Sequence, residues 1–274
     1  SELIRLFAEA CLEEGKQALV PTASFREYTN QSLLAGADVL KVAIAEDGLP
    51  LLEDGLLEKA DLLFLCNPNN PTGRLLSADQ VKDLADRCEN AETFLLVDEA
   101  FIELSRPEES IAALAPEREY LFVMRSLTQS FGVPGLRLGF GVSNPRLSRI
   151  LNLARIPWSI GSIAAAAGEH LLGCWDHLES SRQVIKKEIA YLENALKELG
   201  LEPLPSQVNF ILVNIEASGL ASDILAEKTM RQGVLVRDCQ SFGLGKGYIR
   251  VAVRNREENQ QLIEALKKAI SCRD

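Results

Sequence analysis

The sequence predicts an α/β protein: a mostly parallel sheet flanked by helices, followed by a smaller C-terminal α+β domain. Short apolar runs of strand length occur at 18–20, 39–44, 62–65, 94–97, 121–124 and 138–142, several of them separated by helical patterns. Such runs are buried on both faces, which is typical of parallel sheets covered by helices. From about residue 175 the pattern changes, so we expect a large domain at 1–175 and a small one at 176–274.

The predicted helices of the large domain have start signals. Residues 1–8 begin an amphipathic helix with Leu3, Phe7 and Cys11 on one face and Ser1 in a position to cap it. A second helix is expected over 78–88, after the capping residue Ser77. These helices provide the crossovers that parallel strands require.

The small domain begins with a long charged helix over 175–199. Strand patterns follow at 209–213, 234–237 and 248–253, with helices at 221–231 and from about 257. We expect these helices to lie on one side of a small antiparallel sheet.

Composition excludes several classes of protein. A chain of 274 residues that is 47% apolar can bury a large core, and its net charge of −10 argues against a general nucleic-acid or acidic-membrane binder. We find no leader pattern and no apolar run long enough to span a bilayer. Its six cysteines (11, 66, 88, 174, 239 and 272) include no CxxC pair, which fits reduced thiols in a cytoplasmic protein.

Two polar residues follow predicted strands. Asp98 ends the run 93–97, and Asn70 opens Asn70-Pro71-Thr72-Gly73 after the run 62–66. Ligands of open α/β sheets bind beyond the carboxyl ends of strands, so both are candidate site residues. Each also has a simpler interpretation, because a lone aspartate can cap a helix and Asn-Pro-Thr-Gly alone is an ordinary turn signal.

The segment 125–139, RSLTQSFGVPGLRLG, is the most specific motif. Together with Asn70-Pro71-Thr72-Gly73 and Asp98-Glu99-Ala100-Phe101, it resembles the aspartate-aminotransferase-like enzymes of fold type I, which use pyridoxal 5′-phosphate (PLP). The resemblance covers essentially the whole chain. Gln129 stands at the position of the lysine that forms the Schiff base with the cofactor.

The resemblance implies a role for each matching residue. Asp98 would pair with the PLP ring nitrogen and keep it protonated, and Asn70 would donate a hydrogen bond to the phenolic oxygen. Thr128 and Arg137 would hold the phosphate. A surface ion pair is the simpler interpretation of Arg137, but we expect it in an apolar strand, where an unpaired charge would be costly.

Four further residues match the cofactor site. Ser1 and Glu2 correspond to the phosphate-cradling turn at a helix N-terminus, where main-chain amides suit an anion. Phe25 aligns with an aromatic residue that stacks on the PLP ring, although a plain core role is equally compatible with its spacing. Phe101 takes a place often held by tyrosine, so one hydrogen bond to the cofactor would be missing.

Two arginines are candidate substrate ligands. Arg250 resembles the arginine that grips the substrate carboxylate in this superfamily, and Arg237 lies upstream at a distance that suits a second anion clamp. Two arginines suit a substrate with a carboxylate and a phosphate. The alternative is an ion pair between Arg237 and Asp238 or another carboxylate.

Within fold type I, the segments 133–137, 157–159 and 237–245 most resemble the histidinol-phosphate aminotransferase branch and, inside it, the threonine-phosphate decarboxylases of cobalamin biosynthesis. The implied reaction converts L-threonine O-3-phosphate to aminopropanol phosphate. An aminotransferase is the alternative, because the substrate bond held perpendicular to the PLP ring decides which bond breaks. A binding protein without activity is the third interpretation.

Gln129 puts the activity of this chain in doubt, because an amide forms no Schiff base and transfers no proton. We expect a loss of several orders of magnitude in rate. The resemblance also implies a homodimer, and an N-terminal segment that covers the site and contacts the other subunit. The chain begins inside the cofactor loop, so we expect that segment to be missing.

Two weaker patterns receive structural interpretations. His170 and His177 lie one heptad apart on a predicted helix with Cys174 between them, and we expect ordinary placement with no metal site. Residues 243–247 are rich in glycine but lack the Walker spacing, so we expect a flexible loop.

Overall fold

The computed structural model describes residues 1–271, which divide into two compact units. The first comprises Ser1–Pro68 with Leu75–Leu178, and the second Asn69–Arg74 with residues 179–271. The division at Leu178 lies close to the expected boundary after residue 175. The short segment Asn69–Arg74, which we expected in the large domain, groups with the second unit.

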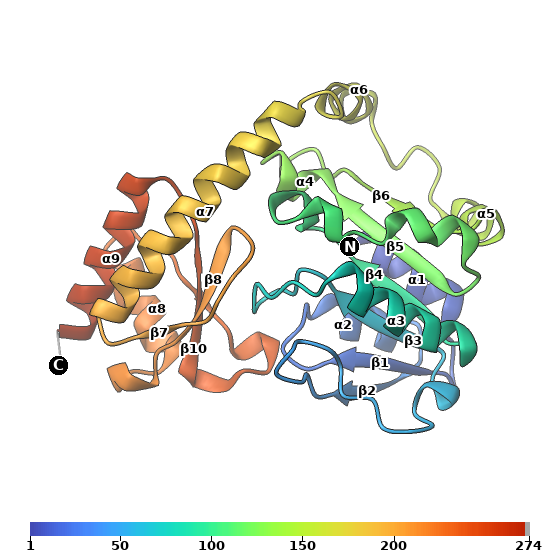
Figure 1. The fold of residues 1–274 in the computed structure, drawn as a ribbon, viewed down its shortest axis with the longest axis horizontal. Coiled ribbons are helices and arrows are strands. Elements are labelled where there is room, and N and C mark those ends of the chain that lie inside the picture. Colours follow the sequence, from blue (N-terminus) through green and yellow to red (C-terminus); the bar gives the residue numbers. More distant parts are fainter. Residues whose placement is uncertain (272–274) are drawn as a thin grey trace. The chain divides into compact units, whose positions relative to one another are not determined.

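The first unit contains a six-stranded sheet, which confirms the α/β class (Figure 1). Its strands are β1 (Gln17–Pro21), β2 (Asp38–Val42), β3 (Leu62–Cys66), β4 (Phe94–Asp98), β5 (Leu121–Ser126) and β6 (Gly139–Val142), in the order β2-β1-β3-β4-β5-β6. All neighbours pair parallel except β5 and β6, which pair antiparallel. The sheet therefore closes on an antiparallel edge strand, as mixed sheets often do.

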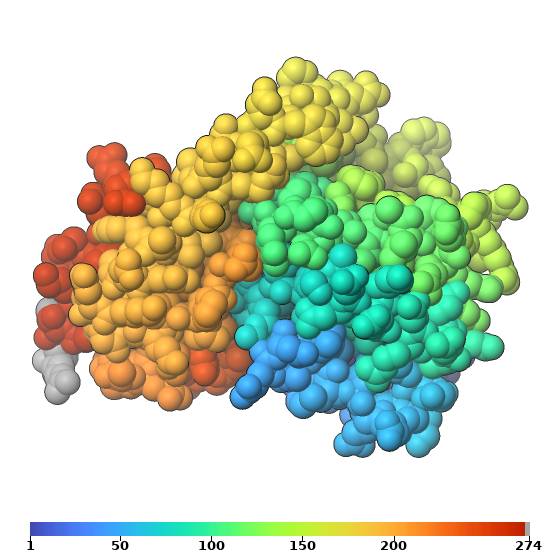
Figure 2. Space-filling model, viewed as in Figure 1, coloured from blue at the N-terminus to red at the C-terminus, as the bar shows by residue number. Residues whose placement is uncertain are grey.

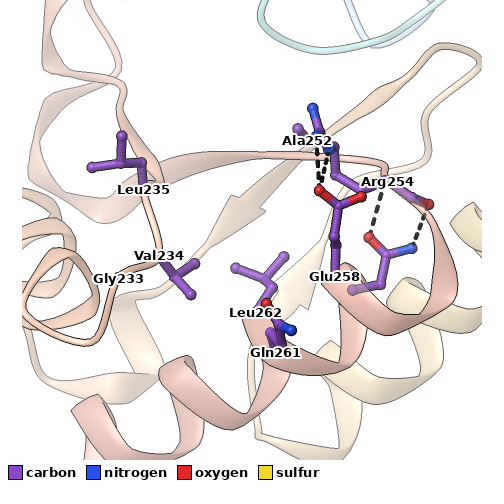
Figure 3. A pocket seen from close by; sticks show the side chains of 9 residues that line it. Gly233, Val234, Leu235, Ala252, Arg254, Glu258, Gln261 and Leu262 are labelled. Atoms are coloured by element: carbon purple, nitrogen blue, oxygen red, sulfur yellow. Dashed lines mark hydrogen bonds and ion pairs between the residues drawn. The ribbon is translucent and has the colours of Figure 1, made fainter.

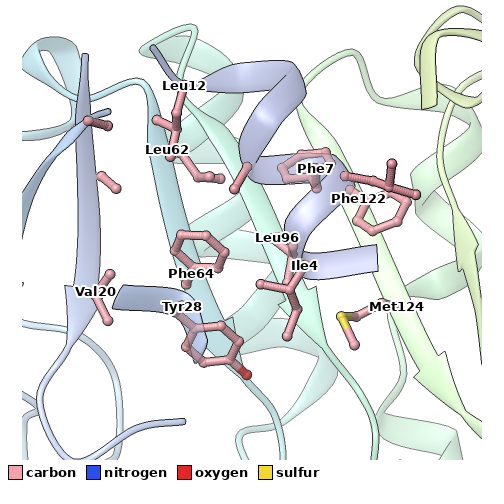
Figure 4. Packing of buried hydrophobic residues seen from close by; sticks show 14 of the residues in the cluster. Ile4, Phe7, Leu12, Val20, Tyr28, Leu62, Phe64, Leu96, Phe122 and Met124 are labelled. Atoms are coloured by element: carbon pink, nitrogen blue, oxygen red, sulfur yellow. The ribbon is translucent and has the colours of Figure 1, made fainter. Parts of the chain in front are cut away.

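Helices cover both faces of this sheet. The helices of this unit are α1 (Glu2–Cys11), α2 (Glu27–Leu34), α3 (Ala78–Asn90), α4 (Leu127–Ser130), α5 (Pro145–Ala154) and α6 (Ser162–Leu171), with short 3-10 helices η1 (Leu57–Lys59), η2 (Ile102–Leu104), η3 (Pro107–Glu109) and η4 (Ala112–Glu117), and α1 and α3 pack against opposite faces of the sheet. Successive side chains of a strand point to opposite faces. Phe64 of β3 accordingly packs with Phe7 of α1 in one cluster (Figure 4), and the adjacent Leu63 packs with Leu84 of α3 in the other.

The capping predictions have mixed outcomes. Ser77 caps α3 as expected, in a capping box with Gln80. Ser1 occupies the N-cap position of α1, but its side chain makes no capping hydrogen bond, so that part of the prediction is wrong. The first-turn N–H groups of α1 therefore donate no hydrogen bond to the Ser1 side chain.

The second unit contains a four-stranded antiparallel sheet, in the order β7-β8-β10-β9. Its strands are β7 (Glu202–Pro203), β8 (Phe210–Asn214), β9 (Arg237–Asp238) and β10 (Tyr248–Ala252). Its helices are α7 (Trp175–Glu198), which starts in the first unit, α8 (Ser222–Met230) and α9 (Arg256–Ser271), with short η5 (Glu216–Ser218), η6 (Gln240–Phe242) and η7 (Gly245–Gly247). The side chains of α7 form a broad exposed surface (Figure 2, gold), as its charged sequence predicts.

The expected strand over 234–237 is mostly wrong. Pairing with β10 is limited to Arg237 and Asp238, so the segment before them leaves part of the sheet edge uncovered. A cavity of about 380 Å³ lies there, lined by residues that include Gly233, Val234, Leu235 and Ala252 (Figure 3). Residues 243–247, expected as a flexible loop, include the 3-10 helix η7.

The cysteines and histidines are widely placed. Cys11, Cys66, Cys88, Cys174 and Cys239 take part in no disulfide, and Cys272 lies outside the described residues. His170 belongs to α6 and His177 to α7, so the expectation that one helix carries both is wrong. Within residues 1–271 we find no cluster of metal-ligating side chains, and no helix with the length and apolar character to cross a membrane.

Candidate active site

The topology of the first sheet marks where a ligand would bind. Strand β1 lies between β2 and β3. The chain therefore passes from β1 to β2 on one side and then crosses to β3 on the other side of β1. A crevice for ligands forms at the carboxyl ends of strands at such a switch point. Asp98 is the last residue of β4, and Tyr28 lies on α2 after β1.

Asp98 is a buried carboxylate with neutral hydrogen-bond donors. It is 4% exposed, its Oδ2 accepts a hydrogen bond from the Tyr28 hydroxyl at 2.7 Å, and its Oδ1 accepts one from the Ala100 N–H at 3.0 Å. Burial raises the pKa of Asp98, and both hydrogen bonds oppose that rise. In the described part of the chain no lysine or arginine pairs with it. A cationic group of a ligand could therefore pair with this carboxylate.

The two candidate phosphate ligands differ in burial. Thr128 of α4 is 8% exposed, and its hydroxyl donates to the Leu138 carbonyl at 3.4 Å. Arg137 is exposed and precedes β6 with a left-handed backbone at φ 53°, so its placement in an apolar strand was wrong. The argument from the cost of a buried charge therefore fails for Arg137. Its Nη1 donates to the Pro134 carbonyl at 3.2 Å, and no carboxylate pairs with it within residues 1–271.

Ser1 lies near both charged candidates. Ser1 and Glu2 are exposed residues at the N-terminus of α1. The charges of Asp98 and Arg137 both act on the Ser1 main-chain nitrogen. The first unit thus brings Ser1, Asp98 and Arg137 into one region.

Gln129 and the two phenylalanines complete the predicted set in this unit. Gln129 is exposed on the one-turn helix α4, and its amide makes no hydrogen bond among the described residues. Phe25 is half-buried, packs against the first core cluster and meets Tyr28 edge-on at 5.8 Å, which favours the core interpretation. Phe101 is partly buried at the start of η2.

Sequence reasoning missed an ion cluster at the ends of β4 and β5. The guanidinium of Arg125 donates from Nε to Glu99 at 3.0 Å and from Nη1 to Glu103 at 2.8 Å. The Ser130 hydroxyl lies 3.4 Å from Glu103, so the cluster reaches α4, which carries Gln129. The acidic residues four apart after β4 were the available signal, but their partner lies on another strand.

The second unit brings Arg250, Arg237 and Asn70 near one another. Arg250 of β10 donates from Nη1 to the Asn70 Oδ1, and its guanidinium lies 4.8 Å from the Phe210 ring and 5.7 Å from the Phe242 ring. Arg237 lies 5.8 Å from the same Phe242 ring. Its Nη2 donates to the Ser241 hydroxyl at 2.9 Å. Phe242 therefore lies close to both guanidiniums.

Neither arginine has a carboxylate partner in the part of the chain that the structure describes. The alternative ion pair between Arg237 and Asp238 is not formed, because Asp238 accepts hydrogen bonds from Ser222 and Gln240. Burial lowers the pKa of Arg250, and the charge of Arg237 adds to that effect. An anion between Arg237 and Arg250 would offset the burial of the Arg250 charge and the repulsion between the two guanidiniums. Arg254, by contrast, is paired with Glu258 at 2.7 Å beside the cavity of Figure 3.

Comparisons with known proteins identify the family of the chain. The family model described as aminotransferase class I and II matches residues 1–266. The chain belongs to this family. A histidinol-phosphate aminotransferase of Symbiobacterium thermophilum is 36% identical, covering 98% of this chain and 74% of that protein. A threonine-phosphate decarboxylase of Salmonella typhimurium is 30% identical, covering 97% and 74%. The crystal structure of the Clostridium acetobutylicum histidinol-phosphate aminotransferase superposes with a TM-score of 0.90 at 25% identity, covering 98% and 81%.

Membership of the class I and II aminotransferase family confirms the predicted fold and the predicted kind of enzyme, and it supports PLP as the cofactor. Aminotransferases and decarboxylases both occur among the similar relatives. Family membership therefore does not decide between amino transfer and decarboxylation, and the site residues must be used to distinguish them.

Proposed function

We propose that this chain binds PLP and L-threonine O-3-phosphate with the residues of a threonine-phosphate decarboxylase, and that Gln129 holds its turnover far below that of a lysine form. The observation that supports the substrate is the pair Arg237 and Arg250, two guanidiniums beside Phe242 with no carboxylate partner among residues 1–271. L-Threonine O-3-phosphate carries both a carboxylate and a phosphate. Histidinol phosphate carries a phosphate and no carboxylate, and 2-oxoglutarate, the amino acceptor in the alternative aminotransferase, carries carboxylates and no phosphate, so only the proposed substrate presents both anions in one molecule.

The cofactor roles follow from hydrogen-bonding capacity. Bound PLP would supply an electron sink for the bond that breaks at the substrate Cα. Asp98 would hold the proton on the ring nitrogen, because a buried carboxylate favours a cationic partner. Asn70 accepts from Arg250 through Oδ1, which leaves its Nδ2 to donate to a phenolic oxygen. Thr128, Arg137 and the main-chain amides of Ser1 and Glu2 would bind the phosphate.

Gln129 separates binding from turnover. Its amide is neutral, forms no covalent link to an aldehyde and transfers no proton. Removal of comparable groups from other enzymes lowers rates by about 10³-fold or more. Noncovalent binding of PLP needs only the other residues, so this chain should bind cofactor without efficient decarboxylation.

The test restores the amine with Gln129→Lys. We expect the spectrum of added PLP to show a protein-linked band only in the lysine form. That form should release carbon dioxide and aminopropanol phosphate from L-threonine O-3-phosphate at least about 10³-fold faster than the form with Gln129. Gln129→Met is the matched control, because methionine has a similar length without an amine.

Three outcomes would contradict parts of this proposal. Amino transfer from histidinol phosphate to 2-oxoglutarate, without carbon dioxide release, would identify the aminotransferase. Cofactor absorbance with no turnover in the lysine form would favour a binding protein. Failure of both forms to bind PLP would reject the cofactor assignment.

The homodimer stays a prediction. The first unit exposes large apolar side chains on and between α5 and α6, among them Leu153 at 81%, Trp158 at 94% and Ile163 at 80%. Apolar side chains grouped in this way are typical of a protein interface.

A further inference from the structure

Tyr28 is a buried phenol whose hydrogen-bond partner is the candidate cofactor ligand. It is fully buried on α2, with its ring stacked on Phe64 at 4.9 Å and edge-on to Phe25 at 5.8 Å. In Figure 4 its hydroxyl points away from the apolar side chains around the ring. A buried hydroxyl needs a partner, and here the partner is Asp98, 70 residues away in the sequence.

The Asp98 carboxylate is held on both oxygens. Tyr28 donates to Oδ2 at 2.7 Å and the Ala100 N–H donates to Oδ1 at 3.0 Å. A carboxylate has about four lone-pair positions, so these two donors fix its rotamer and leave acceptor capacity for a further N–H. Because the ring of Tyr28 is itself packed in the core, the donor cannot swing away from the carboxylate.

We propose that Tyr28 is a positioning residue for the cofactor, whose hydroxyl orients the Asp98 carboxylate toward the ring nitrogen of PLP. This inference rests on the proposed binding of PLP. It assigns to Tyr28 a contribution to cofactor affinity that packing alone does not predict. Phe25, by comparison, meets Tyr28 only through its ring.

The groups around Asp98 decide in which direction the pKa of Asp98 changes when the Tyr28 hydroxyl is removed. Asp98 is faced by the Tyr28 phenol from α2 and by the Ser1 main-chain nitrogen at the start of α1, and the Cys66 thiol at the end of β3 acts on Tyr28. Burial raises the pKa of Asp98 and the Tyr28 hydrogen bond lowers it. Removal of the hydroxyl therefore raises the pKa of Asp98. The carboxyl group then becomes neutral at a higher pH, and it loses its attraction for a protonated ring nitrogen.

The experiment measures the affinity of the natural chain and of Tyr28→Phe for PLP between about pH 5 and pH 8. Phenylalanine keeps the ring packing and removes only the hydroxyl. We expect about tenfold weaker binding near pH 6, a smaller loss near pH 8, and an acid limb of the affinity profile shifted to higher pH. Asp98→Asn supplies the background profile, because it retains every titration except that of Asp98.

Ser32→Ala is the matched control for a purely structural effect. The Ser32 hydroxyl donates to the Tyr28 carbonyl within α2 and does not touch Asp98, so its loss should leave the pH profile unshifted. Equal affinities and an unshifted profile for Tyr28→Phe would overturn the inference. Failure of the natural chain to bind PLP at any pH would instead reject the proposed function, and this inference with it.

A second variant covers the case in which Tyr28→Phe does not fold. Replacement of Tyr28 by 3-fluorotyrosine keeps the shape and makes the phenol a stronger donor. The acid limb should then move to lower pH. A profile that stays in place, or moves to higher pH, would contradict the assignment.

Discussion

Arg125 and Arg250 are both partly buried arginines on strands, but their surroundings differ in charge. Arg125 of β5 meets two carboxylates, Glu99 and Glu103. Arg250 of β10 meets the Asn70 amide oxygen and two aromatic rings, with no carboxylate among residues 1–271. The first charge is matched by the chain itself, whereas the second is left for a ligand. Burial alone thus does not distinguish a structural arginine from a binding one.

The same contrast separates the acidic residues Glu99 and Asp98, which are adjacent in the sequence. Glu99 accepts hydrogen bonds from Ser110 and Ile111 as well as from Arg125. Asp98 has only neutral donors. The motif Asp98-Glu99 therefore combines a carboxylate that stabilises the fold with one that can pair with a cationic ligand.

The largest expected effect comes from Arg125→Leu, which breaks the matched cluster. Two buried carboxylates would lose their cation, so the free energy of unfolding should fall by about 3–5 kcal/mol at pH 7. Arg125 lowers the pKa of Glu99 against the effect of burial, so its removal raises that pKa. As pH falls, the protonated carboxyl no longer needs the cation and the loss should shrink. Urea unfolding at pH 7 and near pH 5 measures both effects.

The control for this variant is Arg146→Leu. Arg146 pairs with Glu119 at 3.1 Å on the surface, where both side chains are more than half exposed. Its loss should cost no more than about 1 kcal/mol. If Arg125→Leu cost no more than this control, or the same amount at both pH values, the cluster would not be the stabilising element described above.

Arg250→Gln tests the unmatched charge and should change binding more than stability. Glutamine keeps an N–H donor of shorter reach, but it carries no charge. We expect about a hundredfold weaker binding of L-threonine O-3-phosphate in the presence of PLP, measured by calorimetric titration, because a charged hydrogen-bonded pair is lost. Arg254→Gln is the matched control in the same unit, since Glu258 already pairs with that arginine. Equal losses in the two variants would remove Arg250 from the binding site.

Features set by neighbouring residues were predictable from the sequence. The run 94–97 is apolar throughout, so a buried strand ending at Asp98 follows from local pattern alone. Arg137 shows where such reasoning fails. The alternation of Leu136, Arg137 and Leu138 resembles a strand, but a left-handed backbone at Arg137 turns the chain before β6 begins. Local spacing does not encode that turn.

Partners distant in the sequence were not predictable. Two contacts depend on which strands lie side by side. They are the hydrogen bond from Tyr28 to Asp98 and the ion pair between Arg125 and Glu103. Arg250 and Arg237 were proposed together from resemblance, but the ring of Phe242 beside both guanidiniums became visible only in three dimensions. Sequence thus identified charged residues, and the fold determined which of their charges are matched.

Arg237→Gln should have the smallest effect. It tests whether Arg237 binds the phosphate of the substrate while Arg250 binds the carboxylate. Arg237 is exposed, so water already screens its charge, and we expect only about tenfold weaker binding of L-threonine O-3-phosphate. Binding of L-threonine, which lacks the phosphate, should stay unchanged if Arg250 holds the carboxylate. Ser241→Ala keeps the Arg237 charge but removes the hydrogen bond that Arg237 donates to Ser241 at 2.9 Å. The loss of affinity in this variant should therefore be smaller still. An equal decrease for both ligands would mean that Arg237 does not distinguish the phosphate, and the two arginines would then share one anion.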